Sequence, residues 1–287
     1  MVKVRVSTDS TADVPQNFLE ELDIPVLPLT VLAEGKEYRD GVDITPQEFY
    51  KLLDACTELP VSAQVSVNLY TRLFEDTLKA GFTHLIHVSI NAKGSGTYQA
   101  GEMAKELFYE EHPEAKDKLS IRIIDSRTYS MGYGLAVIEG ARLAKEGGSP
   151  EEVNARIQDF LDHSRILVVP LNLRFCKQSG RVSAAAAFLG DAIGLKPMVT
   201  FEKGESKILA KPRGLSKAVE AMIETCRKER RPGTSYALAY TENPEAFQAL
   251  KSACLPALGE EPTAQFPLGC IISLNIGPDS IGLIYRT

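Results

Sequence analysis

The sequence predicts an α/β protein of two domains, because strands and helices alternate in its first half and follow another pattern in its second. Apolar runs over 2–7, 83–90 and 120–125 are each followed by a segment with helical signals. This alternation is typical of a parallel sheet covered by helices. The second half mixes paired strands with helices, which indicates a mixed, partly antiparallel sheet. We therefore expect a Rossmann-like N-terminal domain and an α+β C-terminal domain.

Capping signals place several helices of the first half. Thr45-Pro46-Gln47-Glu48 is a capping box with proline at the first helical position, and it predicts a helix over 46–54. Ser66 is expected to open a helix that Gly81 ends. The other elements expected in this half are a strand over 24–32 that turns into a hairpin ending at Tyr38, and helices over 96–110 and 130–146.

The domain boundary is expected where one helix ends and another begins at once. Gly147-Gly148 is typical of a helix end, and Ser149-Pro150-Glu151-Glu152 of a helix start. This junction predicts domains over 1–148 and 149–287. In the second domain, strands are expected over 165–173, 197–201, 207–211, 235–241, 268–275 and 280–286, and helices over 184–189, 215–229 and 244–256.

Composition excludes several classes of protein. The net charge is −6 and the basic residues are dispersed, which disfavours nucleic acid as a partner. No apolar stretch approaches the ~18 residues of a membrane span, and the N-terminal run is typical of a strand rather than of a signal peptide. The five cysteines are scattered without a C-x-x-C motif, which indicates reduced thiols and a cytoplasmic location. The four histidines are equally dispersed, and no metal site is expected.

Three polar segments follow the apolar runs of the first half, over 7–13, 91–98 and 125–128. Loops at the carboxyl ends of parallel strands carry backbone N–H groups, hydroxyls and helix N-termini, all of which suit an anionic ligand. Such Ser, Thr and Asp residues also serve as helix caps, and for Asp9 we expect capping rather than catalysis. Three segments of this kind in one domain favour a ligand site.

The ordered motifs of the chain resemble those of the DegV family. They are V-S-T-D-S-T-A-D from Val6, S-G-T-Y from Ser95, D-S-R-T-Y-S-M-G-Y-G from Asp125, G-R-V-S from Gly180 and I-G-P-D-S-I-G-L from Ile276. The resemblance covers essentially the whole chain. It implies a two-domain α/β protein that binds a long-chain fatty acid between its domains. Some members of the family carry the acid for an ATP-binding fatty acid kinase subunit, which phosphorylates the carboxylate.

The resemblance also implies which residues meet the head group of the acid. Family members surround it with a hydroxyl of a T-S-Q-P-S-like segment, a serine of an S-S-x-L-S-G-T-Y loop and a histidine of a G-T-H-T-G-P-G tail. The matching positions here are Ser62, Asn91, Ser95, Gly96 and Asn275. Asn275 stands where the family has histidine, so it can donate hydrogen bonds but never carry a positive charge.

Three further residues follow from the same resemblance. Asp279 replaces a glycine of the tail, and its carboxylate would repel an anionic head if it faced the site. Arg181 in K-Q-S-G-R-V-S matches a family loop where the acid head is expected to meet the kinase partner, and its planar fork suits a phosphate. Phe188, like Phe175, is a candidate for lining an acyl tunnel, although core packing is the commoner role for such residues.

The leading hypothesis is a lipid-binding protein without cofactor or catalysis of its own. One alternative keeps the lipid pocket but changes the ligand to a lipid with another head group. A second is an enzyme of phosphoryl transfer or hydrolysis on a small molecule, with Asp9, Ser95 and Arg181 in its site, although no general base is found for Ser95. A third is an interaction protein with a vestigial pocket.

Overall fold

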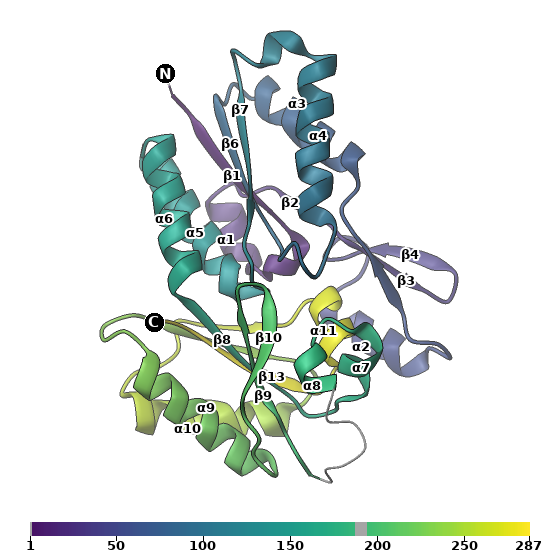
Figure 1. The fold of residues 1–287 in the computed structure, drawn as a ribbon, viewed down its shortest axis with the longest axis vertical. Helices are drawn as coiled ribbons and strands as arrows, with labels where there is room; N and C mark the ends of the chain where they lie inside the picture. The colour runs from purple at the N-terminus through teal and green to yellow at the C-terminus, as the bar shows by residue number, and fades with distance from the viewer. Residues whose placement is uncertain (1, 187–193) are drawn as a thin grey trace. The chain divides into compact units, whose positions relative to one another are not determined.

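The computed structural model describes residues 2–186 and 194–287 (Figure 1). By their contacts, the residues form two compact units, each built from two stretches of chain. The first unit joins Met1–Thr30 to Ser62–Asp162, and the second joins Val31–Val61 to His163–Thr287. The boundary expected at 148/149 falls inside the first unit, next to α6 (Pro150–His163). Phe188 and the end of the helix expected over 184–189 lie outside the described residues.

The first unit contains the parallel sheet that the alternating pattern predicts. Its strand order is β2-β1-β6-β7, and every neighbouring pair is parallel. Figure 1 shows α3 and α4 on one side of this sheet and α1, α5 and α6 on the other. The strands are β1 (Val4–Asp9), β2 (Val26–Leu27), β6 (His84–Ser89) and β7 (Ser120–Asp125); the helices besides α6 are α1 (Gln16–Glu21), α3 (Val67–Lys79), α4 (Thr97–Glu111) and α5 (Met131–Lys145).

The second unit is built on a mixed sheet of six strands, in the order β10-β9-β8-β13-β11-β12. All neighbouring pairs are antiparallel except β11 and β12, which confirms the α+β expectation for this half. Leu167, Met222 and Leu250 belong to the buried cluster between this sheet and its helices. The strands are β8 (Ser164–Pro170), β9 (Met198–Glu202), β10 (Glu205–Ala210), β11 (Tyr236–Tyr240), β12 (Ala264–Pro267) and β13 (Ser280–Arg286); α9 (Leu215–Glu229) and α10 (Pro244–Leu258) cover it.

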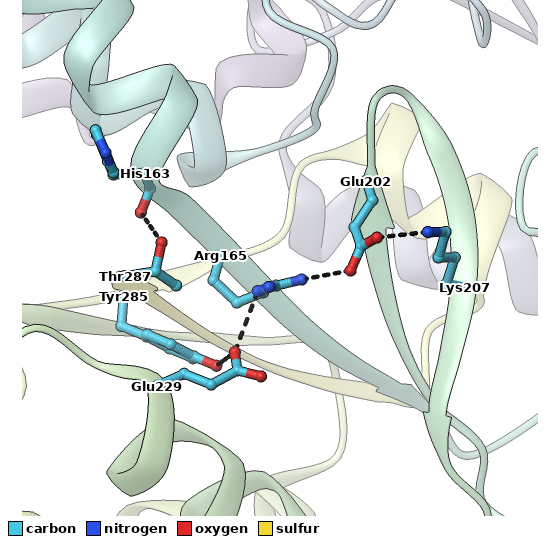
Figure 2. A network of polar contacts seen from close by, with 7 residues as sticks. All are labelled: His163, Arg165, Glu202, Lys207, Glu229, Tyr285 and Thr287. Carbon is cyan, nitrogen blue, oxygen red and sulfur yellow. Dashed lines mark hydrogen bonds and ion pairs between the residues drawn. The ribbon is translucent and has the colours of Figure 1, made fainter.

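A polar network ties several of these elements together at one end of the sheet (Figure 2). Arg165 on β8 donates to Glu202 on β9 over 3.0 Å and to Glu229 at the end of α9 over 3.2 Å. Lys207 on β10 pairs with Glu202, and the hydroxyl of Tyr285 on β13 donates to Glu229 over 2.8 Å. Because these ion pairs are partly exposed, we expect each to stabilise the unit only modestly.

The prediction of a strand over 268–275 is wrong, because most of this segment belongs to the helix α11 (Cys270–Ile276). Five of its seven residues are buried, so the apolar run carries no helical periodicity that would separate it from a buried strand. Asp40 stabilises the start of α11, since its carboxylate accepts the N–H of Cys270 over 3.3 Å. Tyr50 donates to the carbonyl of Leu268 just before the helix, over 3.0 Å.

The remaining elements are short. The strand expected over 24–32 is divided into β2 and β3, with Pro28 between them. The capping box at Thr45 opens a helix as predicted, and its side-chain and backbone bonds to Glu48 are both formed. These elements are α2 (Pro46–Ala55), α7 (Arg174–Ser179), α8 (Ser183–Ala186), and a small sheet in the order β4-β3-β5, with β3 (Thr30–Ala33), β4 (Lys36–Arg39) and β5 (Val61–Ala63).

Gly134 provides a test of how tightly α5 packs in the first unit. A Cβ at this position would lie 2.5 Å from the backbone oxygen of Ala12, which cannot move away alone. We expect Gly134→Ala to lower the free energy of unfolding by about 1–3 kcal/mol in chemical denaturation. Gly96→Ala is the matched control, because its Cβ would meet only the end of the exposed Gln64 side chain, which can rotate away. Equal stabilities of the two variants would contradict the packing argument.

Candidate functional site

The three polar loops of the first unit meet at the carboxyl edge of the parallel sheet. The N–H of Asn91 donates to the carbonyl of Thr128 over 3.2 Å, and the N–H of Ala92 donates to Asp125 Oδ1 over 2.9 Å. The N–H of Ile90 donates to Asp9 Oδ2 over 2.8 Å. The loops after β1, β6 and β7 are therefore bonded to one another, as their positions in the sequence predict.

Asp9 has no exposed surface and joins these loops from the end of β1. Besides Ile90, it accepts the N–H of Thr11 over 3.1 Å and the hydroxyl of Tyr133 over 2.7 Å. Burial raises the pKa of the Asp9 carboxyl, and these hydrogen bonds oppose the rise. The geometry confirms capping as a role of Asp9, since it is the N-cap of the short helix Ser10–Ala12.

A second buried polar group is His87 on β6, which is paired with Ser7 on β1. His87 has no exposed surface, and its Nδ1 lies 2.9 Å from Ser7 Oγ and its Nε2 lies 3.0 Å from the hydroxyl of Tyr70. Burial lowers the pKa of His87 to about 3. The ring is therefore neutral in the folded protein at physiological pH, and it links β1 and β6 to α3.

Asn91 organises the loop that follows β6. Its Nδ2 donates to the hydroxyl of Tyr129 over 2.8 Å, and its Oδ1 accepts the N–H of Lys93 over 3.2 Å. Its backbone oxygen accepts the N–H groups of Gly94 and Ser95 over 3.0 and 3.2 Å. The fully buried Asn91 side chain thus has a structural function, and contact with a ligand stays a prediction.

Ser95 and Gly96 lie at the start of α4, where helix N–H groups point toward the end of the sheet. Ser95 Oγ accepts the N–H of Thr97 over 3.3 Å and lies 2.9 Å from its hydroxyl. Gly96 is the N-cap residue. The positive end of a helix dipole and its unbonded N–H groups favour an anion at this position.

The segment that contains Ser62 runs beside the start of α4. Ser62 is half-buried on β5, and the N–H of Val65 just beyond it donates to Thr97 Oγ1 over 3.4 Å. The side chain of Gln64 lies so close to Gly96 that a Cβ there would be 2.0 Å from its Oε1. The structure thus brings the Ser62 segment, Ser95 and Gly96 together within one unit.

The other predicted residues lie in the second unit, where two distant motifs are adjacent. Asn275 is near the end of α11, and its Nδ2 donates to the carbonyl of Ile271 over 2.6 Å. Ser179 Oγ donates to the backbone oxygen of Asn275 over 3.1 Å. Arg181 is exposed two residues beyond Ser179, and its Nη1 donates to the Ser179 carbonyl over 2.7 Å. The Arg181 turn and the C-terminal end of α11 therefore form one surface of this unit.

Two neighbouring residues have their own partners. The carboxylate of Asp279 accepts a hydrogen bond from Asn243 Nδ2 over 2.6 Å. Phe175 is buried and packs against Gly277, where a Cβ would lie 2.7 Å from its ring. Gly277 also has a φ of +92°, so both the space and the backbone conformation require glycine there.

Tyr129 and Gln64 shape the predicted site but are absent from the predicted set of residues. The signal that points to them is the pair Gly94 and Gly96, neither of which has a positive φ. A glycine without a backbone need for it indicates the close approach of another group. Tyr129 approaches Gly94, and Gln64 approaches Gly96.

Two searches of the described residues bear on other kinds of site. Within residues 2–186 and 194–287, no three His, Cys, Asp or Glu side chains are grouped so that they could hold a metal ion. In that same part of the chain, no helix has the length and apolar character needed to cross a membrane.

The fold and the loop site define a class of two-unit α/β proteins with polar loops at the end of a parallel sheet. The model of the DegV family of uncharacterised proteins matches residues 3–287, and the chain belongs to this family. A DegV domain-containing protein of Caldanaerobacter subterraneus subsp. tengcongensis is 33% identical over 292 aligned residues, which cover 100% of this chain and 99% of that protein. One from Clostridium perfringens is 29% identical, with 98% of each chain covered.

Solved structures share the fold. The structure of a DegV family protein from Thermus thermophilus, described for its fatty acid binding, matches with a TM-score of 0.88 at 29% identity over the whole of both chains. A stearic acid-binding protein from Eubacterium ventriosum matches with a TM-score of 0.87 at 23% identity and covers 100% of this chain and 98% of its own. Fatty acid binding is thus a property of similar proteins with this architecture.

The buried His87 predicts a specific dependence of stability on pH. The folded state keeps the ring neutral down to about pH 3, whereas the unfolded chain takes up a proton as the pH falls below ~6.5. Stability is therefore lost as the pH falls through this window, by up to ~1.4 kcal/mol per pH unit from this residue. We expect His87→Gln to reduce that slope by about one proton between roughly pH 4 and 6. Denaturant titrations of both proteins at several pH values measure it, and equal slopes would contradict a neutral buried His87.

Proposed function

We propose that the chain binds a long-chain fatty acid and holds its carboxylate at the start of α4. The observation that carries the proposal is the convergence of Ser95, Gly96 and the Ser62 segment at this helix end. A carboxylate leaves water only where hydrogen-bond donors replace its hydration, and a helix N-terminus with hydroxyls beside it provides them. The likeness to the Thermus thermophilus protein over the whole chain supports the same ligand.

The acyl chain supplies most of the binding free energy in this proposal. Each buried methylene contributes about 0.8 kcal/mol, whatever the head group. From the family resemblance we propose that the acyl chain lies between the two domains and that Asn275 is a further donor to the head group. Asn91 contributes through the loop it organises as well as through any direct contact.

We further propose that the protein presents the bound acid to an ATP-binding kinase subunit and catalyses no reaction itself. Arg181 is exposed, and a guanidinium suits bidentate contact with a phosphate or carboxylate of the partner complex. Ser95, the candidate nucleophile of the enzyme hypothesis, bonds the hydroxyl and N–H of Thr97 rather than a general base. The five cysteines are all free, which supports a cytoplasmic location.

Identifying any lipid bound to the purified protein tests the binding proposal directly. We expect native mass spectrometry of the purified protein to show the added mass of one fatty acid, and extraction to release it. We expect Ser95→Ala and Ser62→Ala each to weaken oleate binding roughly three- to tenfold, because this is the effect on affinity of losing one neutral hydrogen bond. Ser149→Ala is the control, because Ser149 also accepts a helix N–H, that of Glu152 over 3.3 Å.

Three outcomes would contradict the proposal or part of it. A protein that carries no lipid and takes up neither oleate nor palmitate does not bind long-chain fatty acids. A protein that carries a different lipid has another head-group specificity. Weakening by Ser149→Ala equal to that by Ser95→Ala would show that loss of a helix cap, rather than of a ligand contact, lowers the affinity.

The variant Arg181→Ala tests presentation of the acid to the kinase subunit separately from binding of the acid. We expect Arg181→Ala to leave the dissociation constant for oleate unchanged and to lower the rate of acyl phosphate formation with an ATP-binding fatty acid kinase subunit by roughly tenfold or more. A hydrogen bond to a charged group contributes about 1.5–3 kcal/mol, which corresponds to such a factor. Arg122→Ala, which removes an exposed arginine of the first unit, is the control. A rate unaffected by Arg181→Ala would contradict the proposed contact.

A further inference from the structure

Tyr129 lies against the backbone of the loop that leads to α4. It is half-buried between β7 and α5, and its hydroxyl accepts a hydrogen bond from Asn91 Nδ2 over 2.8 Å. A Cβ on Gly94 would lie 2.3 Å from that hydroxyl oxygen and 3.1 Å from the ring carbon that carries it. The end of the tyrosine ring therefore occupies the space that a side chain at position 94 would need.

The contact between Tyr129 and Asn91 reaches Ser95 through backbone hydrogen bonds. The oxygen of Asn91 accepts the N–H groups of both Gly94 and Ser95, at 3.0 and 3.2 Å. Its side-chain oxygen accepts the N–H of Lys93 at 3.2 Å. Because one residue fixes all three of these N–H groups, a shift of Asn91 moves Ser95 and the start of α4.

The backbone on both sides of Tyr129 has an uncommon conformation. Arg127 has a φ of +57° and Ser130 a φ of +51°, and neither is glycine. Residues other than glycine adopt such angles only where several surrounding contacts hold the backbone in place, often at functional sites. Here, Arg127 N–H donates to Asp125 Oδ1 over 2.9 Å, its guanidinium pairs with Asp162 over 2.7 Å, and Ser130 Oγ donates to Asp13.

We propose that Tyr129 is a positioning residue for the head-group site at the start of α4, which rests on the proposed function. The strained segment Arg127–Ser130 holds the tyrosine over Gly94, and its hydroxyl fixes Asn91. Asn91 in turn sets the positions of Ser95 and Gly96. The side-chain amide of Asn91 reaches the Tyr129 hydroxyl over 2.8 Å. Tyr129 and Asn91 therefore act as a pair, and they determine head-group affinity without contacting the acyl chain.

The first test measures the loop without any ligand. We expect Tyr129→Phe to accelerate amide hydrogen exchange in 91–97 roughly three- to tenfold, because the loop loses one hydrogen bond that restrains it. Tyr109→Phe is the matched control. Tyr109 is also half-buried in this unit, and its hydroxyl donates to the Leu119 carbonyl over 2.7 Å and accepts the Ile121 N–H over 3.0 Å at the opposite end of β7. We expect this control to leave exchange in 91–97 unchanged.

The second test measures the affinity of the delipidated protein for a fluorescent fatty acid, cis-parinaric acid, by titration. We expect Tyr129→Phe to weaken binding roughly three- to tenfold and Tyr109→Phe to leave it unchanged. We expect Gly94→Ala to weaken binding more in the wild-type background than in Tyr129→Phe, because the hydroxyl that the new Cβ meets is then gone. This non-additivity is the signature of a direct contact between positions 94 and 129.

The outcomes separate the positioning role from the proposed function. If the wild-type protein fails to bind cis-parinaric acid, the proposed function is wrong, and the exchange measurement alone decides whether Tyr129 fixes the loop. If the wild type binds the acid but Tyr129→Phe changes neither exchange nor affinity, the positioning role is wrong and the proposed function stands. Equal weakening by Tyr109→Phe, or additive effects of the 94 and 129 substitutions, would also overturn the positioning role.

Discussion

The buried carboxylate of Asp9 is the interaction on which the polar end of the parallel sheet depends. A carboxylate without solvent contact must be satisfied by hydrogen bonds, since an unsatisfied one costs several kcal/mol. Asp9 obtains them from its own turn at Thr11, from Ile90 directly after β6 and from Tyr133 on α5. None of these three segments can shift without breaking a hydrogen bond to this buried carboxyl group. The loop that follows β6 is therefore fixed at its first residue, Ile90.

The register of the strands makes this arrangement possible. Thr8 on β1 is paired with Val88 on β6, and Ser89 is paired with Asp125 on β7. Because all three strands run parallel and end at the same level, their loops leave the sheet side by side. His87 provides the support below this edge, since its neutral ring joins Ser7 to Tyr70 of α3 in the interior. Two buried polar groups thus hold the end of the sheet to the helices on its two sides.

Local chemistry explains which parts of the fold could be predicted from the sequence. The capping boxes at Thr45 and Ser149 are bonds between residues three apart, and both are formed. The alternation of strands and helices likewise reports burial within short windows, so the parallel order of the first half was predictable. The helix α11 was not predictable, because an apolar run that is buried on nearly every side has the same sequence pattern in a helix and in a strand. Its helical form depends on Asp40 and Tyr50, which lie over two hundred residues away in the sequence.

In the candidate site, too, residues of local motifs could be predicted from the sequence, whereas contacts between distant segments could not. Motifs identified Ser95 and Gly96. The glycines at positions 94 and 96 indicate that other groups come close, but not which ones, because Tyr129 and Gln64 come from distant segments. Within their own units, the amides of Asn91 and Asn275 already donate to Tyr129 and to Ile271. The groups that the described contacts bring together at the start of α4 include the Ser95 hydroxyl and backbone N–H groups, which are neutral. In the proposed site these neutral groups would stabilise an anion through their oriented dipoles, and asparagine at position 275 adds no positive charge. The selectivity of the proposed site for a carboxylate over an uncharged head would then depend on how accurately those dipoles are aimed, and this is what the proposed positioning by Tyr129 and Asn91 would control.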